Sequence, residues 1–371
     1  MIQCFPVRST PDLFYRCSLA DKSKPAPIQT ERAILVKLSI PKGYSSPLDL
    51  FETQRAIKAV KDYFEQSLSS ALNLTRVTAP LFVRPETGLN DNLSGVERPV
   101  QFSLSGPDNG TAEIVQSLAK WKRYALKKYG FRTGSGLYTD MNAIRRDDIT
   151  DAIHSIYVDQ WDWEKIIPQE NRNIETLKNV VERIYGCLIA TEAHVLSLYP
   201  VLGRTMLPNK ITFITAQELE DAYPDLTSQQ REYEAVKKHG AVFIIGIGGA
   251  LKSGKPHDSR APDYDDWNLN GDIILYNQLL DIPFEISSMG IRVDAETLMK
   301  QLKISGSTER ASLPFQASLL ANELPQTVGG GIGQSRLCMF FLRKAHIGEV
   351  QCSIWSEATI RECEKAGIIL L

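Results

Sequence analysis

A run of glycines near the C-terminal end constrains this chain more than any other stretch. It reads Gly329-Gly330-Gly331-Ile332-Gly333-Gln334-Ser335-Arg336. Glycine weakens the interior of a strand, so a glycine-rich strand indicates that another group packs closely against its backbone. The apolar residues 337–342 predict a buried helix directly afterwards. Arg336 then lies at the junction, where its guanidinium can bind phosphate oxygens. A flexible glycine turn is the alternative, so other parts of the chain must decide.

The predicted elements follow the order helix, strands, helices, strands, helix. Apolar residues at helical spacing predict one helix of about six turns beginning near Ser46–Asp49 and another at 174–199. Alternating residues predict a strand at 75–83, where Pro80 indicates an edge or an interface. Further strands are predicted at 137–146, 154–164, 241–247, 271–276 and 283–290. Strands joined by hairpins favour an α+β fold on an antiparallel sheet over a doubly wound one.

Composition excludes several classes of protein. The 371 residues carry a formal net charge of -2 and are 43% hydrophobic, as expected for a globular protein. Because no basic block is present, we expect no nucleic-acid partner. No apolar run approaches the ~18 residues of a membrane span, so we expect no membrane contact. The six cysteines show no CxxC or metal-site spacing, which favours reduced thiols and a cytoplasmic location.

Residues 1–35 show no periodic pattern, and residues 36–371 are predicted to form a single domain. The N-terminal extension could be a disordered tail, a transit segment or the product of an upstream start codon. Transit peptides are poor in acids and rich in arginine. This stretch contains Asp12, Asp21 and Glu31. A poorly ordered tail is therefore favoured.

The strand predicted at 154–164 places polar side chains on an otherwise apolar face. A period of two puts Gln160 and Asp162 on one side and Trp161 and Trp163 on the other. Buried polar groups need partners, so this face predicts a binding site. The alternative is that the strand simply leaves the core there. On the helix that opens near Ser117, Lys120 and Lys122 point about 200° apart, so at most one should face a site.

Acidic residues suggest where a metal ion could bind. Asp272 and Glu285 lie on predicted strands shortly before the glycine run, and Ser287 should share a face with Glu285. Carboxylate oxygens suit Mg²⁺, although lone acids on strands are often just exposed to solvent. The acids at 258–266 lack the spacing of an EF-hand. Gly248-Gly249 resembles a dinucleotide fingerprint only weakly, because the third glycine and the helix are missing.

Several stretches together resemble the ammonia-dependent (type A) asparagine synthetases. The spacing Gly-x-Gly-x-Gly-x-x-Arg is also similar to the third signature motif of class II aminoacyl-tRNA synthetases. The likeness covers roughly residues 38–371 and excludes only the N-terminal extension. The segments that carry it are 91–95, 117–123, 157–164, 260–267, 287–294 and 325–336.

The resemblance implies a class II synthetase-like catalytic core and a homodimer, with the first helix and the Pro80 strand as the dimer-forming motif. It implies an enzyme that joins L-aspartate to ammonia with ATP and Mg²⁺, through a β-aspartyl-adenylate, releasing AMP and pyrophosphate. The chain also lacks a nucleophilic cysteine in the contexts that glutamine-dependent enzymes use. Free ammonia is therefore the expected nitrogen donor.

The resemblance also assigns roles to residues. Arg145 should hold the α-phosphate, and Arg336 should contact ATP from the glycine strand, whose missing side chains would admit the adenine or ribose. The acids Glu285 and Asp272 should bind Mg²⁺. Asp91 should bind ammonium and remove its proton. The remaining expected ATP-binding residues are Tyr264, Asp265, Gly331 and Gly333, and the expected aspartate-binding residues are Ser117, Lys122, Gln160, Asp162, Ser288 and Arg292.

Two other interpretations were weighed. An asparaginyl- or aspartyl-tRNA synthetase would need an anticodon-binding domain, for which the chain has no room outside the core, and a basic face. A non-catalytic paralogue would be expected to lose Arg145, Arg336 or the acids proposed for Mg²⁺, and all of these are present.

Overall fold

The computed structural model describes residues 40–371 except 92, 94–96 and 107–108. The described residues belong to one compact unit, Leu38–Leu371. The N-terminal extension predicted at 1–35 lies outside them.

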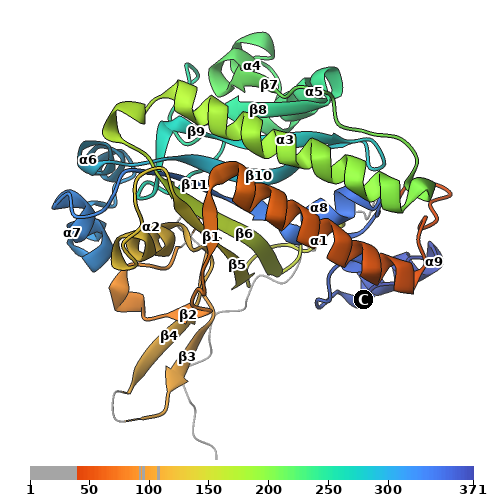
Figure 1. Cartoon of the computed structure of the whole chain (residues 1–371), viewed down its shortest axis with the longest axis horizontal. Helices are drawn as coiled ribbons and strands as arrows, with labels where there is room; N and C mark the ends of the chain where they lie inside the picture. Colours follow the sequence, from red (N-terminus) through yellow and green to blue (C-terminus); the bar gives the residue numbers. More distant parts are fainter. Residues whose placement is uncertain (1–39, 92, 94–96, 107–108) are drawn as a thin grey trace, which may run out of the picture. The chain divides into compact units, whose positions relative to one another are not determined.

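A large mixed sheet organises this unit (Figure 1). Five neighbouring pairs in its centre are antiparallel, whereas the pairs β1–β5 and β7–β8 at the two edges are parallel. The α+β prediction is therefore confirmed, with parallel pairing added only at the edges. In spatial order the strands are β1 (Leu74–Arg76), β5 (Gly136–Ile144), β6 (Tyr157–Ile166), β11 (Thr327–Gly333), β10 (Ile282–Arg292), β9 (Asp265–Asn277), β8 (Ala241–Ile245) and β7 (Thr212–Thr215).

Two long helices lie side by side across one face of the sheet (Figure 1): α1 (Leu50–Leu72) and α3 (Ile174–Leu198). The first begins at Asp49, which forms a capping box with Glu52 and so satisfies free amide groups at the helix start. Apolar residues of both helices pack with Trp161 of β6 and with α8 (Gln334–Phe341) in the main hydrophobic core. This face is therefore closed by apolar packing.

The opposite face of the sheet carries shorter helices. Near the centre, Lys122 of α2 (Ala119–Lys128) reaches β6 and β11 on this side. Towards the β7 edge, α4 and α5 cover a second apolar cluster. The bounds of the other elements are α4 (Ala216–Ala222), α5 (Ser228–His239), α6 (Ala295–Ile304), α7 (Pro314–Leu320), α9 (Glu357–Lys365), and a separate small sheet of β2 (Phe82–Val83), β4 (Gly110–Ile114) and β3 (Gln101–Leu104).

Two sequence predictions about strands are wrong in detail. The single strand predicted at 75–83 is divided: β1 joins the large sheet, and β2 joins the small sheet after Pro80. Proline has no amide hydrogen to continue a ladder, which fits a break at this point. Ser287 does not share a face with Glu285, because the pairing of β10 with β9 shifts register between these two residues. The shift is typical of a β-bulge and brings Ser288 to the side of Glu285.

Candidate active site

A cavity of about 320 Å³ collects most of the predicted site residues on the α2 side of the sheet. It lies over β6, β11 and β10, the strands that carry the glycine run and the alternating polar residues. The predicted residues that line it are Ser117, Lys122, Arg145, Gln160, Asp162, Tyr264, Asp265, Glu285, Ser288, Arg292 and Gly331. Asp91, Asp272, Gly333 and Arg336 are not among its lining residues.

Alternate side chains of β6 form the floor of the cavity. Trp161 and Trp163 are buried in the apolar core, while Gln160 and Asp162 line the cavity. Asp162 forms a buried ion pair with Lys122, whose ammonium also donates to the backbone oxygen of Gly330 over 2.8 Å. Burial lowers the pKa of Lys122, and the charge of Asp162 opposes this shift. Since β6 stays covered through Ile166, the alternative that the strand leaves the core is wrong.

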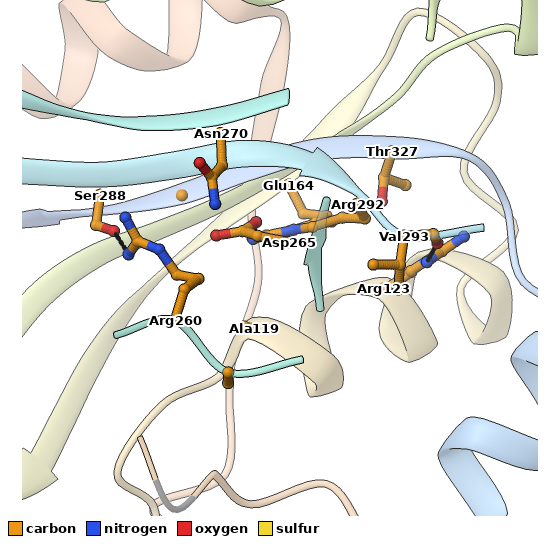
Figure 2. A network of polar contacts seen from close by, with 12 residues as sticks. Ala119, Arg123, Glu164, Arg260, Asp265, Asn270, Ser288, Arg292, Val293 and Thr327 are labelled. Carbon is orange, nitrogen blue, oxygen red and sulfur yellow. Dashed lines mark hydrogen bonds and ion pairs between the residues drawn. The ribbon is translucent and has the colours of Figure 1, made fainter. Parts of the chain in front are cut away.

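A buried ionic network fixes Arg292 at the end of β10 (Figure 2). Its Nη2 lies 2.8 Å from Oε2 of Glu164, and its Nη1 is bonded to Asp265. Thr327 Oγ1 donates to Glu164 Oε1 over 2.6 Å. Burial would raise the pKa of Glu164, but Arg292 outweighs it and holds that pKa below its usual value. The guanidinium is therefore immobilised at the cavity wall by two carboxylates.

The glycines of β11 allow side chains from neighbouring strands to cross the strand closely. A Cβ atom on Gly329 would lie 1.9 Å from Glu164 Oε2, and one on Gly331 would lie 2.4 Å from Gln160 Oε1. The predicted strand and its close contacts are thus present, and the flexible-turn alternative is wrong. At these two positions, however, the closely packed group is a side chain of β6.

Arg260 is a cavity residue that the sequence analysis did not single out. Its Nη2 lies 2.6 Å from Asp272 Oδ1, and its Nη1 is bonded to Ser288 Oγ (Figure 2). Burial, together with the nearby charge of Glu285, raises the pKa of Asp272 to about 6. The two acids predicted to bind Mg²⁺ are therefore neighbours, although Asp272 is already paired. Within the described ranges, no group of three or more Asp, Glu, His and Cys side chains could hold a metal ion.

Arg336 occupies the first turn of α8, as predicted from the glycine run. Its Nη1 donates to the backbone oxygen of Glu285 over 2.7 Å, which directs the side chain toward β10. The start of this helix is held by Asp159 on the far face of β6. Asp159 accepts hydrogen bonds from the amide of Ser335 over 3.0 Å and from its hydroxyl over 2.8 Å. A carboxylate at this end also interacts favourably with the helix dipole.

Asp91 lies outside the cavity lining and is almost fully buried, with 4% of its surface exposed. One carboxylate oxygen accepts a hydrogen bond from the amide of Leu93 over 3.1 Å. The other has no hydrogen-bond partner among the described residues. Burial raises the pKa of this carboxyl to about 6. Such a group can accept a proton near neutral pH.

Sequence reasoning missed several lining residues besides Arg260. Some were visible in the resembling segments, since Arg260 and Ala261 lie within 260–267 and Ala119 within 117–123. Other lining residues reach the cavity only because of the fold, and the local sequence pattern does not indicate them. The missed lining residues are Leu93, Glu97, Ala119, Asp148, Ser259, Arg260, Ala261 and Gly330.

Comparison with known proteins identifies the family. Residues 51–367 match the family model described as aspartate-ammonia ligase. An aspartate–ammonia ligase of Clostridium perfringens is 62% identical over 335 residues, which cover 90% of this chain and 99% of that protein. The corresponding protein of Ruminiclostridium cellulolyticum is 59% identical over 331 residues, covering 89% and 98%.

Solved structures show the fold. An asparaginyl-tRNA synthetase of Entamoeba histolytica superimposes with a TM-score of 0.59 at 14% identity, covering 82% of this chain and 69% of that one. An asparaginyl-tRNA synthetase of Pyrococcus horikoshii, complexed with asparaginyl-adenylate, gives a TM-score of 0.57 at 16% identity, covering 81% and 68%. The chain therefore has a class II aminoacyl-tRNA synthetase-like fold and belongs to the aspartate–ammonia ligase family.

Proposed function

We propose that this enzyme makes L-asparagine from L-aspartate and ammonia through a β-aspartyl-adenylate, with release of pyrophosphate and AMP. The observation that carries the proposal is the charge pattern of one cavity. It combines Arg145 and Arg292 with the anionic and amide groups of Asp162 and Gln160, and with Lys122. ATP and an amino acid with two carboxylates and one ammonium need such a mixture. Family membership supports the ligase and does not favour the tRNA synthetase or the non-catalytic paralogue.

The first step activates a poor acyl donor. An oxygen of the aspartate β-carboxylate attacks the α-phosphorus of ATP, and the bond to pyrophosphate breaks. The step needs alignment and charge neutralisation more than a protein nucleophile. Arg145 lines the cavity, and its Nε has no partner among the described residues, so it is available for an α-phosphate oxygen. Ser117 and Lys122 would hold the carboxylates of aspartate, and Ser288 and Arg292, which line the same cavity, would bind this substrate as well.

The nucleotide would lie along the end of β11. Gly333 leaves room at the end of the strand, whereas the space beside Gly331 is taken by the side chain of Gln160. Gly331 would contact ATP through its backbone, and Arg336, Tyr264 and Asp265 through their side chains. The three atoms nearest to a Cβ on Gly333 belong to the side chain of Arg336, at 3.2 Å or more, so this end of the strand is less crowded than Gly329.

Mg²⁺ would be held by Glu285 and Asp272. Their proximity fits a cation, because Glu285 raises the pKa of Asp272 and a positive charge would relieve this repulsion. Two carboxylates plus substrate phosphates and waters are an ordinary ligand set for Mg²⁺. When bound, the ion neutralises charge on the departing pyrophosphate. Arg260 would then exchange its bond to Asp272 for a phosphate oxygen.

The second step forms the amide. Ammonium transfers a proton to Asp91, and the resulting ammonia attacks the β-carbonyl carbon of the adenylate. The bond from that carbon to the AMP oxygen then breaks, and the nitrogen loses its second proton to solvent to give the neutral amide. The unpartnered oxygen of Asp91 and its pKa of about 6 support this role, because the carboxylate is ionised at neutral pH and has a free acceptor site. Gln160 and Asp162 would bind the α-ammonium of aspartate meanwhile.

Asp91→Asn tests the proposal by separating the two steps. We expect the variant to keep aspartate-dependent exchange of pyrophosphate into ATP and to lose most ammonium-dependent asparagine formation. Asparagine formation at the wild-type rate would contradict the role of Asp91. Loss of exchange in a folded variant would instead place Asp91 in the first step. Absence of ATP turnover by the wild type with aspartate and ammonium would contradict the ligase itself.

We further propose a cytoplasmic homodimer that acts without nucleic acid. Exposed apolar side chains support the dimer: Phe51 of α1 is 78% exposed, and Leu81, beside Pro80, is 50% exposed. Large exposed apolar groups often mark interfaces. Light scattering should give twice the monomer mass, and Phe51→Glu should lower it.

Among the residues that the structure describes, no helix has the length and apolar content needed to cross a membrane.

A further inference from the structure

A second group of buried charges lies next to the cavity and has no part in the steps above. Lys120 Nζ is 3.3 Å from Asp263 Oδ2, and the side chains are 5% and 0% exposed. Gln316 of α7 donates to the same oxygen over 2.8 Å. Arg310, in the turn before α7, places Nη1 3.7 Å from it. Unlike Lys122, Lys120 does not line the cavity, in agreement with the expectation that only one of the two lysines faces it.

These residues lie close to the segment that carries Asp91. Gln116, just before α2, donates its side-chain amide to the backbone oxygen of Asp91 over 2.8 Å. Lys120 follows on the first turn of α2 and pairs with Asp263, which is bonded to Gln316. Gln316 also lies near Gly88, three residues before Asp91, where an added Cβ would be 3.0 Å from Gln316 Oε1.

Two carboxylate oxygens in this cluster have no hydrogen-bond partner among the described residues: Oδ2 of Asp91 and Oδ1 of Asp263. Both residues are at least nine-tenths buried. Burying a charge is costly unless another charge compensates it, so the ionisation of Asp91 depends on the charged groups nearby. These are Lys120 from α2, Asp263 and Tyr264 from the segment before β9, and Arg145 from the loop after β5.

We propose that the buried Lys120–Asp263 ion pair is a positioning device for the second step, which keeps Asp91 ionised and its free oxygen available when ammonium arrives. This inference rests on the proposed role of Asp91. Neither member of the pair lines the cavity. Lys120 supplies the positive charge that favours the carboxylate, and Asp263 limits that charge so that Asp91 remains basic enough to take a proton.

The two charges act on Asp91 with opposite sign, which makes the proposal testable. Lys120 lowers the pKa of Asp91, whereas Asp263 raises it. Lys120→Met should therefore keep Asp91 protonated to higher pH and move the acid limb of asparagine formation upward by about one pH unit. Asp263→Asn should move the limb downward. A variant with both changes should lie near the wild type, because the two effects cancel.

The measurement is asparagine formation between pH 5 and 9 at saturating ATP and aspartate, beside pyrophosphate exchange without ammonium. The acid limb of the pH profile should move for asparagine formation and not for pyrophosphate exchange. A general loss of structure would affect both assays. Lys127→Met is the matched control: it removes the same charge from α2 at a pair with Glu323 on the surface, and should leave both profiles unchanged.

The inference would be overturned if folded Lys120→Met and Asp263→Asn left the acid limb of asparagine formation unshifted. It would also be overturned if asparagine formation and pyrophosphate exchange shifted equally. If neither variant folds, Arg310→Gln decides, because its side chain is 19% exposed and its charge acts on Asp263. It should shift the limb upward by less than Lys120→Met, and no shift would count against the proposal. If Asp91→Asn makes asparagine normally, the proposed function of Asp91 fails first. If Asp91 is needed and the limbs stay in place, only this inference fails.

Discussion

Both faces of β6 bury side chains, and yet they are held together by different interactions. On the α1 and α3 side, Trp161 and Trp163 of β6 are 1% and 0% exposed within apolar packing. On the α2 side, Asp162 and Glu164 of the same strand are 4% and 0% exposed and are paired with Lys122 and Arg292. Burial alone therefore does not show what a residue contributes. Each apolar contact adds stability independently, whereas each buried charge is stable only while its ion-pair partner is present.

The physical reason is the cost of removing charge from water. Apolar burial contributes roughly 25 cal/mol per Å² and has no required partner. The attraction within a buried ion pair offsets the cost of desolvating both charges only when the geometry is accurate. Loss of one partner leaves a buried charge without compensation. In the proposed function these charges bind ATP and aspartate, so this face would maintain function at the expense of stability.

Arg292→Leu should have the largest effect on stability, because it leaves both Glu164 and Asp265 buried without their cation. We expect the free energy of unfolding to fall by about 4 kcal/mol, measured by urea denaturation. Adding Glu164→Leu to this variant should restore part of the loss. A loss below about 1 kcal/mol would mean that the charged face tolerates incomplete networks.

Leu68→Ala tests the apolar face. Leu68 is fully buried in α1, and its truncation should cost about 3 kcal/mol through lost burial and a cavity. Because no charge is uncovered, the loss should be the same at pH 6 and pH 8, and asparagine formation per folded molecule should be retained. A strong pH dependence of the loss would remove the contrast between the faces.

Asp91→Asn should stabilise the protein at neutral pH. In the folded state the pKa of Asp91 is about 6, above the usual value of an aspartate. The folded state therefore loses stability as the pH rises from that usual value through about 6. The variant should gain on the order of 2 kcal/mol at pH 8 and almost nothing at pH 4. Denaturation curves at both pH values check this. An equal gain at both would point to packing instead of charge.

Asp159→Asn should give the smallest change, about 1 kcal/mol, because asparagine keeps one acceptor oxygen at the start of α8 and only the charge that pairs with the partly exposed Lys61 is lost. Since Arg336 is the next residue after Ser335, KM for ATP in pyrophosphate exchange should rise several-fold while kcat changes less. Asp140→Asn is the control, since at the same helix end Asp140 accepts a hydrogen bond from the side chain of Gln334, and its other partner, Arg76, forms an exposed ion pair with it. Equal effects of the two would argue against positioning by Asp159.

Local pattern was enough to predict a large part of this protein. The alternation at 160–163 placed two polar residues on the cavity floor and two tryptophans in the core, because side chains alternate along any strand. The glycine run predicted a strand, the following helix and the position of Arg336, since each depends on residues that are adjacent in the chain. The resemblance supplied the fold and the reaction, which the comparisons confirm.

Only the tertiary structure decided which charges meet. Arg292 and Glu164 are 128 residues apart, and Lys120 and Asp263 are 143 apart, so no local period relates them. The register shift in β10 placed Ser288, which only the resemblance had indicated, and not Ser287 on the side of Glu285. The pairing of Arg260 with Asp272 gave a predicted metal ligand a cationic partner. Periodicity determines which face a side chain takes, because it follows from backbone geometry. The ionisation and partners of a buried group depend on distances that exist only after the strands have paired.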